Sequence, residues 1–171
     1  MQELIISNVK NAEFTAANLN EFFEPGKKHK RSFEYQKSAV SNPFTAGVGK
    51  LSVCFYTLQP GKASYPYHFH LGSEEVYYII SGQGTLKTPE GEKAVSEGDV
   101  IVMPANEAGA HMLINTSNAP LVYLDVDTVD LNAPEAAVYP DSGKIMTWKH
   151  GKNEIRKMFR LNDEVNYLDG E

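Results

Sequence analysis

The sequence predicts an all-β protein, built as a closed barrel or as two facing sheets. Two observations support this prediction. From residue 48 onward, short runs rich in β-branched and aromatic residues alternate with Gly, Pro, Asn and Ser, which is typical of sandwiches and barrels and not of alternating strands and helices. The chain has 171 residues, 42% of them hydrophobic, with nine Tyr and eight Phe, so one sizeable core can be buried.

Seven segments of the chain are predicted to be strands. The first, 51–58, is rich in β-branched and aromatic residues and ends at the turn signal Pro60-Gly61. The others are 76–80, 85–87, 93–96, 99–103, 111–115 and 121–126, separated by turns that contain Gly, Pro, Asn or Ser. Seven short strands joined by such turns are expected to form a closed or double-sheet β architecture.

The two ends of the chain do not share this pattern. Residues 10–34 lack a period of two, and 16–23 are expected to form a short helix or an irregular arm. Asn132 and Pro134 suit the start of a short helix, and the mostly charged stretch 144–171 is expected to lie across the barrel surface. We therefore expect one domain in three parts: an N-terminal arm (1–47), a β-barrel (48–127) and a C-terminal extension packed on the barrel (128–171).

Charge and composition argue against several functions. A formal net charge of −6 gives no broad basic field, so neither nucleic acid nor a membrane is expected as a partner. The longest apolar runs, such as 76–80, are far shorter than the roughly 20 residues of a membrane helix. The one cysteine, Cys54, cannot form an internal disulfide, and the N-terminus lacks the pattern of a signal peptide. These features predict a cytoplasmic protein.

Three histidines and a glutamate predict a metal site. His68 and His70 lie two residues apart, and in an extended strand such positions point to the same face. Glu75 follows at the start of the next strand, and His111 belongs to a later strand that must come alongside for the site to close. Imidazole nitrogens with one carboxylate oxygen suit a divalent Zn, Fe, Mn or Ni ion better than Ca or Mg. We expect one such ion per chain.

Two segments resemble the motifs of the cupin family. Gly61 to Gly82 is similar to the first motif, in which His-x-His is followed by a Glu and then by a Gly six residues further, so that Glu75 fits better than Glu74. Gly98 to Asn115 is similar to the second motif, although its loop 104–109 is longer than usual. The resemblance implies a double-stranded β-helix, also called a jelly-roll barrel. The tail 139–144 looks like an uncharacterised branch of single-domain cupins, which implies no particular reaction.

Other side chains near the expected site allow more than one interpretation. Alternation turns Tyr77 inward, where it either orients a ligand or donates a proton, or simply fills the barrel. Tyr65 and Tyr67 precede the first histidines and are candidates for the mouth of a pocket. His29 and His150 lie in polar sequence and are expected to be solvated.

The expected metal site predicts a metal-dependent enzyme, and the resemblance to cupins, which include isomerases, epimerases and dioxygenases, implies an activity of one of these types. Its substrate is expected to be a small polar, sugar-like or keto-acid molecule bound in the barrel. The motifs contain no general base beyond the ligands, so the alternative is a non-catalytic binding or sensing protein that uses the metal as an anchor. A homodimer is expected through the apolar outer positions Val76, Tyr78 and Ile80, which the N-terminal arm of the same chain could instead cover.

Overall fold

The computed structural model describes residues 4–47, 49–149 and 154–171. Val48, the first residue of the expected barrel, and His150, one of the expected solvated histidines, lie outside the described residues. The described part consists mainly of strands with short helical turns between them. In chain order the elements are η1 (Val9–Asn11), β1 (Thr15–Asn18), α1 (Leu19–Phe23), β2 (Glu34–Ser41), α2 (Pro43–Ala46), β3 (Leu51–Leu58), β4 (Phe69–His70), β5 (Glu75–Ser81), β6 (Gln83–Thr88), β7 (Gly91–Ser96), β8 (Val100–Met103), η2 (Glu107–Gly109), β9 (Met112–Ile114), β10 (Leu121–Thr128), β11 (Glu135–Tyr139), η3 (Pro140–Ser142), β12 (Lys144–Lys149) and β13 (Ile155–Arg160).

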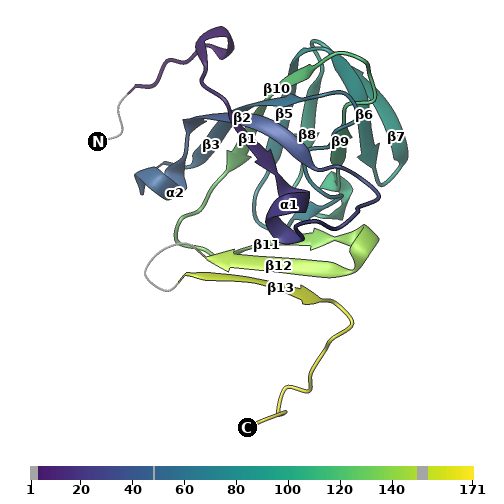
Figure 1. Ribbon diagram of the computed structural model, residues 1–171. Coiled ribbons are helices and arrows are strands. Elements are labelled where there is room, and N and C mark those ends of the chain that lie inside the picture. Colours follow the sequence, from purple (N-terminus) through teal and green to yellow (C-terminus); the bar gives the residue numbers. More distant parts are fainter. Residues whose placement is uncertain (1–3, 48, 150–153) are drawn as a thin grey trace.

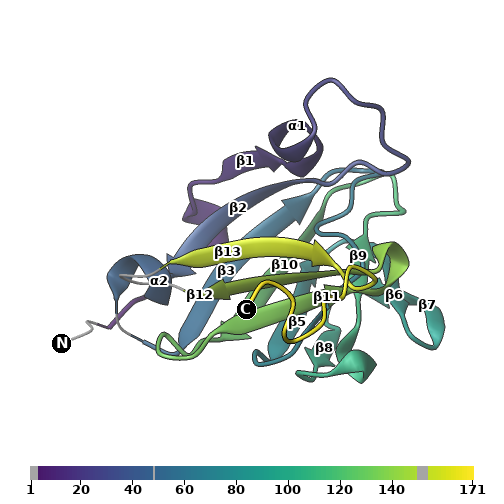
Figure 2. The ribbon, with the colours of Figure 1, turned by 90° about the horizontal axis from the view of Figure 1, so that it is seen from below.

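The strands form a double-sheet barrel, which confirms the predicted all-β jelly roll (Figures 1 and 2). One sheet has six strands in the order β1-β2-β3-β10-β5-β8. The other side is made of two smaller sheets, β13-β12-β11-β4 and β7-β6-β9. An antiparallel bridge between His68 and His111 joins these two, next to β4 and β9. The barrel therefore closes at the residues expected to bind metal.

The main hydrophobic core lies between the two sides of the barrel. Along β10, Leu121 and Tyr123 are fully buried, as a strand of period two with one inward face requires. Leu58 of β3 and Leu113 of β9 meet in the same cluster, although they come from opposite sides of the barrel. The remaining buried members of this cluster are Tyr35, Tyr56, Tyr77, Ile79, Leu86, Val95 and Met103.

The seven predicted strands are all present as β3 and β5 to β10, with ends that differ by at most two residues. β4 was not predicted as a strand because two residues are too short for a periodic pattern. Within 16–23, part of the arm is indeed a short helix, α1, whose N-cap is Asn18: its side chain accepts a hydrogen bond from Glu21 N. The preceding β1 and the long β2 extend the six-stranded sheet, so the arm contributes strands as well.

One prediction for the C-terminal part is wrong. No helix begins near Asn132; a turn there, in which Asn132 N donates to the side chain of Asp130, leads into β11. The mostly charged stretch that follows contains the antiparallel pair β12 and β13, at 144–149 and 155–160. Strands form here because of tertiary pairing. β11 bonds to β4 on one side and to β12 on the other, which extends the sheet from the barrel into the C-terminal extension.

The residues expected to form a dimer contact, Val76, Tyr78 and Ile80, lie on the outer face of β5. Tyr78 is 43% exposed there, while Val76 and Ile80 are half-buried. The N-terminal arm bonds to β3 at the opposite end of the six-stranded sheet. The homodimer stays a prediction. Across the described ranges, no helix combines the length and the apolar character needed to cross a membrane.

Two leucines of β3 offer a matched test of where the core lies. Leu58 is fully buried, whereas Leu51 is 49% exposed at the other end of the same strand. Leu58→Ala is expected to lower the free energy of unfolding by about 2–5 kcal/mol, because a cavity replaces packed atoms. Leu51→Ala is expected to cost less than about 1 kcal/mol. Urea denaturation measures both, and equal losses would contradict this placement of the core.

Candidate metal centre

The fold brings His68 and His111 together through the backbone. His68 N donates to His111 O at 3.1 Å, and His111 N donates to His68 O at 2.8 Å. Residues that exchange both bonds stand directly opposite each other on antiparallel strands, with their side chains on one face. The two imidazole rings accordingly lie 4.8 Å apart between centroids. The later strand that must come alongside is thus β9, and His111, which immediately precedes it, is paired with His68 by this bridge.

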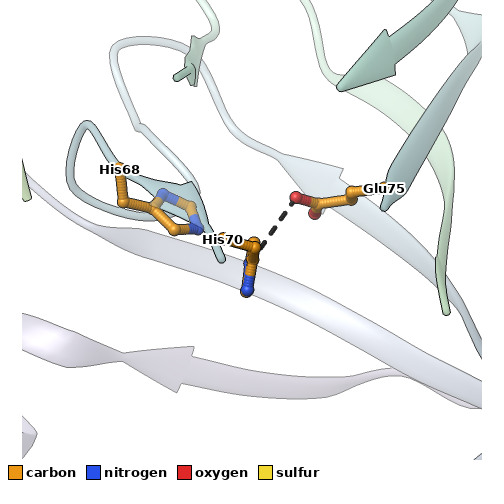
Figure 3. Close-up of side chains that lie close together, drawn as sticks. All are labelled: His68, His70 and Glu75. Atoms are coloured by element: carbon orange, nitrogen blue, oxygen red, sulfur yellow. Dashed lines mark ion pairs between the residues drawn. The ribbon is translucent and has the colours of Figure 1, made fainter. Parts of the chain in front are cut away.

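Glu75 faces the histidines from the other side of the barrel. His68, His70 and Glu75 each offer one ligand atom, and these three atoms all lie within 4.8 Å of one another (Figure 3). Glu75 Oε2 lies 3.8 Å from His70 Nε2, the pair marked in Figure 3, and 3.2 Å from His111 Nε2. All four residues predicted to bind the metal therefore gather at one point, with His111 joining the group through its contact with Glu75.

Backbone carbonyls fix the orientation of two imidazoles. His68 Nδ1 donates to Pro66 O at 2.8 Å, and His111 Nδ1 donates to Gly109 O at 2.9 Å. In the neutral ring each of these bonds leaves Nε2 as the atom with a free lone pair. This is the usual arrangement of histidines that bind metals, in which one nitrogen is held by the protein and the other is presented to the ion.

Burial and mutual contact favour the metal-binding form of His68 and Glu75, whereas His111 is shifted toward its protonated form beside Glu75. Burial lowers the pKa of His68 to about 3, so its imidazole is neutral. Burial alone would raise the pKa of Glu75, but the surrounding imidazoles, His111 foremost, lower it to about 2. Burial also opposes protonation of His111, yet the Glu75 carboxylate raises its pKa overall. An ionised carboxylate among imidazoles is the result.

The residues present fit a divalent ion. The donor set comprises three imidazoles and one ionised carboxylate, which suits a borderline divalent cation. His70 Nδ1 and Glu75 Oε2 are buried and have no hydrogen-bond partner among the described residues. Unpartnered buried polar atoms are costly, and a cation next to Glu75 would compensate for part of that cost.

The lengthened loop before His111 is closed by a glycine. Residues 107–109 form the 3₁₀ turn η2, whose N-cap Asn106 accepts a bond from Ala108 N. A Cβ atom on Gly109 would lie only 2.1 Å from the carbonyl oxygen of Pro104. Only glycine therefore fits this close approach, and the same residue supplies the carbonyl that orients His111.

A cavity of about 290 Å³ opens beside the metal centre. His68, His70 and Glu75 form part of its wall. The C-terminal extension forms another part: the ring of Tyr139 stacks on His68 at 5.7 Å, and the ring of Trp148 lies edge-on to His70 at 6.0 Å. Strands outside the expected barrel thus shape the ligand site.

Two carboxylates in this cavity were not predicted. Asp125 and Asp127 of β10 line it, and together with Glu75 they form a second group whose ligand atoms lie within 4.8 Å of one another. Burial, with Glu75 next in effect, raises the pKa of both, that of Asp127 to about 8. The strand pattern offered a signal for Asp125, because it continues the inward positions of Leu121 and Tyr123. The same period of two reaches Asp127, which lies one residue beyond the predicted end of that strand and stands opposite Glu75 in the sheet.

The tyrosines suggested by the sequence have different roles. Tyr77 is fully buried in the core and does not line the 290 Å³ cavity; its hydroxyl lies 3.2 Å from His111 Nε2. Tyr65 lines the cavity and donates to Tyr35, whereas Tyr67 is buried elsewhere beneath Lys87. Their positions favour Tyr77 as a core residue that contacts the metal-binding residue His111, and Tyr65 as part of the cavity wall. His29 is exposed.

Comparison with known proteins agrees with the fold. Residues 54–127 match the model of the cupin domain family. A structure of a putative sugar phosphate isomerase from Acidithiobacillus ferrooxidans superposes with a TM-score of 0.65 at 24% identity, over 77% of this chain and 80% of that one. A sugar phosphate isomerase of the cupin superfamily from Silicibacter pomeroyi gives 0.64 at 23% identity, over 78% and 82%. The match to the cupin domain thus covers residues 54–127, and the fold of the chain is that of these two solved structures.

One curated relative has a named activity. Glucose-6-phosphate isomerase of Thermococcus kodakarensis is 34% identical over 94 residues, which is 48% of this chain and 49% of the relative. An uncharacterized protein of Methanocaldococcus jannaschii is 37% identical over 57 residues, 33% of this chain and 44% of that protein. The chain thus spans about half the length of the curated relatives it matches, or less.

Replacing one ligand tests the metal centre. His68→Ala is expected to weaken binding of a divalent metal by at least about 100-fold. Replacing a residue that only hydrogen-bonds to a metal-binding histidine already lowers metal affinity by about 10- to 100-fold. His29→Ala removes an exposed histidine and should leave the affinity unchanged. Elemental analysis after dialysis, together with competition against a chromophoric chelator, measures the difference. Full metal content in both variants would contradict the site.

Proposed function

We propose that this protein is a metal-dependent isomerase of a small, sugar-like carbonyl compound. The observation that carries the proposal is the shared cavity: the metal-binding group and the carboxylates of Asp125 and Asp127 line one space of about 290 Å³. Small-molecule sites occupy roughly 300–1,000 Å³, so this space suits a single sugar unit and not a dinucleotide.

The four ligands and the carboxylates supply complementary chemistry. An ion held by His68, His70, Glu75 and His111 would polarise a carbonyl oxygen of the substrate. Isomerisation of an aldose to a ketose moves one proton from the carbon beside the carbonyl to the carbonyl carbon, and a second proton from the hydroxyl of that neighbouring carbon to the carbonyl oxygen. It therefore needs a group that accepts the carbon-bound proton and returns it. In the motifs no such group was visible; in the folded chain two carboxylates face the cavity.

Asp127 is the better placed of the two for this role. It stands directly opposite Glu75 in the pairing of β10 with β5, so its side chain shares the face of the metal centre. It also borders a second cavity, of about 250 Å³, that shares His70 and Trp148 with the first. Asp125 is only 4% exposed and lies deeper, against Glu75 and the buried tyrosines, where it helps to hold that carboxylate in position.

The walls of the cavity support chemistry away from bulk water. Tyr56, Tyr139 and Trp148 line it with aromatic surface. Aromatic surfaces beside polar side chains help to orient a small ligand within the site. The name of the Thermococcus relative, glucose-6-phosphate isomerase, agrees with a sugar substrate.

Turnover by defined metal forms tests the proposal. The protein is prepared with Fe, Mn, Zn or Ni and incubated with aldoses, ketoses, their phosphates and small keto acids, and products are followed by NMR. We expect interconversion of an aldose and a ketose in at least one metal form and loss of activity on chelation. Tight binding without turnover in every form would instead favour the non-catalytic, ligand-sensing alternative. Oxygen consumption with a keto acid would point to a dioxygenase.

The proton-transfer role of Asp127 has its own test. Asp127→Asn keeps the size of the side chain but removes its basicity, so kcat is expected to fall by roughly 100- to 10,000-fold. Asp163→Asn changes an exposed aspartate outside the cavity and serves as the matched control. Metal content must stay equal in both variants. Unchanged kcat in Asp127→Asn would contradict the assignment.

A further inference from the structure

We propose that Arg156 is the anion-recognition residue of the cavity, and that the ligand therefore carries a phosphate or carboxylate group apart from its metal-binding end. This inference rests on the proposed function in that it names the class of substrate for the same site. Arg156 belongs to β13 of the C-terminal extension and lines the 290 Å³ cavity together with the metal-binding residues.

Strand register places Arg156 on the same face as the metal centre. Across β4, β11 and β12, His70 stands opposite Ala137, and Ala137 stands opposite Met146. Trp148 lies two residues from Met146 and so shares its face, and it stands opposite Arg156 in β13. All of these side chains therefore point toward the cavity, as their presence in its lining also shows.

The separation between β4 and β13 defines the kind of ligand. Three strand spacings amount to roughly 14 Å between the two backbones, which the long Arg side chain partly bridges. A molecule bound to the metal by one end would meet the guanidinium only with a group several bonds away. The wall between the two contains Tyr139, whose ring stacks on His68. Burial raises the pKa of Tyr139, and the nearby Arg156 guanidinium opposes part of this rise.

The charges around the cavity leave Arg156 without an internal counterpart. Among the described residues it makes no ion pair, although Lys62 and Lys87 each find a carboxylate. Other charged groups of the cavity wall are acidic: Glu75, Asp125, Asp127 and Glu154. A guanidinium binds phosphate and carboxylate through two parallel N–H bonds, so an unpaired one in a ligand cavity suits an anionic substituent. Glu75, which is ionised, would repel that substituent and so favour one orientation of the ligand.

The neighbouring residue of β13 provides a matched control. Lys157 stands opposite Thr147 and points to the other face of the sheet, outside the cavity. Arg156→Gln and Lys157→Gln thus remove one positive charge each from adjacent positions of the same exposed strand. Any effect of net charge on anion binding is common to both variants, whereas a direct contact is specific to Arg156.

Calorimetric titration of the metal-loaded full chain tests the inference with three probes: glucose 6-phosphate, glucuronate and glucose. Comparison of glucose 6-phosphate with glucuronate shows whether the site prefers a phosphate or a carboxylate group. We expect one anionic sugar to bind at least 10-fold more tightly than glucose. Arg156→Gln should weaken that binding roughly 10- to 100-fold, the range of a charge-assisted hydrogen-bonded contact, while glucose binding and metal content stay the same. Lys157→Gln should change the affinity less than about threefold.

The results separate this inference from the proposed function. Equal weakening in both variants, no weakening in Arg156→Gln, or no preference for an anionic sugar over glucose would overturn the role of Arg156. Binding that depends on Arg156 without any turnover would contradict the isomerase and leave the anion site in place. Arg156→Lys, which keeps the charge but not the two parallel bonds, is expected to fall between the wild type and Arg156→Gln.

Discussion

The paired backbone hydrogen bonds between His68 and His111 are the constraint on which the rest of the structure depends. They join the two smaller sheets into the second side of the barrel and, in the same step, set two imidazoles on one inward face. Glu75 is then buried against these rings, and an ionised carboxylate at this depth is tolerable only because imidazoles, and a cation when bound, surround it. The bridge that closes the barrel therefore also places two of the proposed metal ligands side by side.

The C-terminal extension turns this centre into a ligand site. β11 bonds to β4 at His70 and Phe69, and β12 and β13 continue the sheet beyond the barrel (Figure 2). The extension supplies the aromatic rings beside the histidines and the single arginine of the cavity wall, while β10 supplies the carboxylates. Metal-binding, proton-transfer and anion-binding groups thus come from three different parts of the chain, and the proposed reaction needs all three to be folded together.

Local patterns were sufficient for the barrel strands and the ligands but not for the contacts that only tertiary pairing creates. The run 51–58 was recognisable as β3 because its residues favour strands, and His68, His70, Glu75 and His111 stood out because they repeat a known spacing. β12 was missed since its charged ends resemble a surface segment, although Trp148 in its interior packs against His70. Asp127 was missed because the strand was predicted to end at 126, and its position opposite Glu75 arises from the register between β10 and β5. Arg156 gave no signal because its strand reaches the cavity only through two intervening strands.

The most direct test of the central claim is X-ray absorption spectroscopy at the edge of the bound metal, on protein loaded with one equivalent of Zn or Fe. A centre built by the His68–His111 bridge predicts first-neighbour nitrogen and oxygen atoms at about 2.0–2.2 Å, with the multiple-scattering features of three imidazole rings and no sulfur. A spectrum without imidazole scattering, or with only oxygen neighbours, would contradict the account, because the metal would then be bound somewhere other than at the junction that closes the barrel.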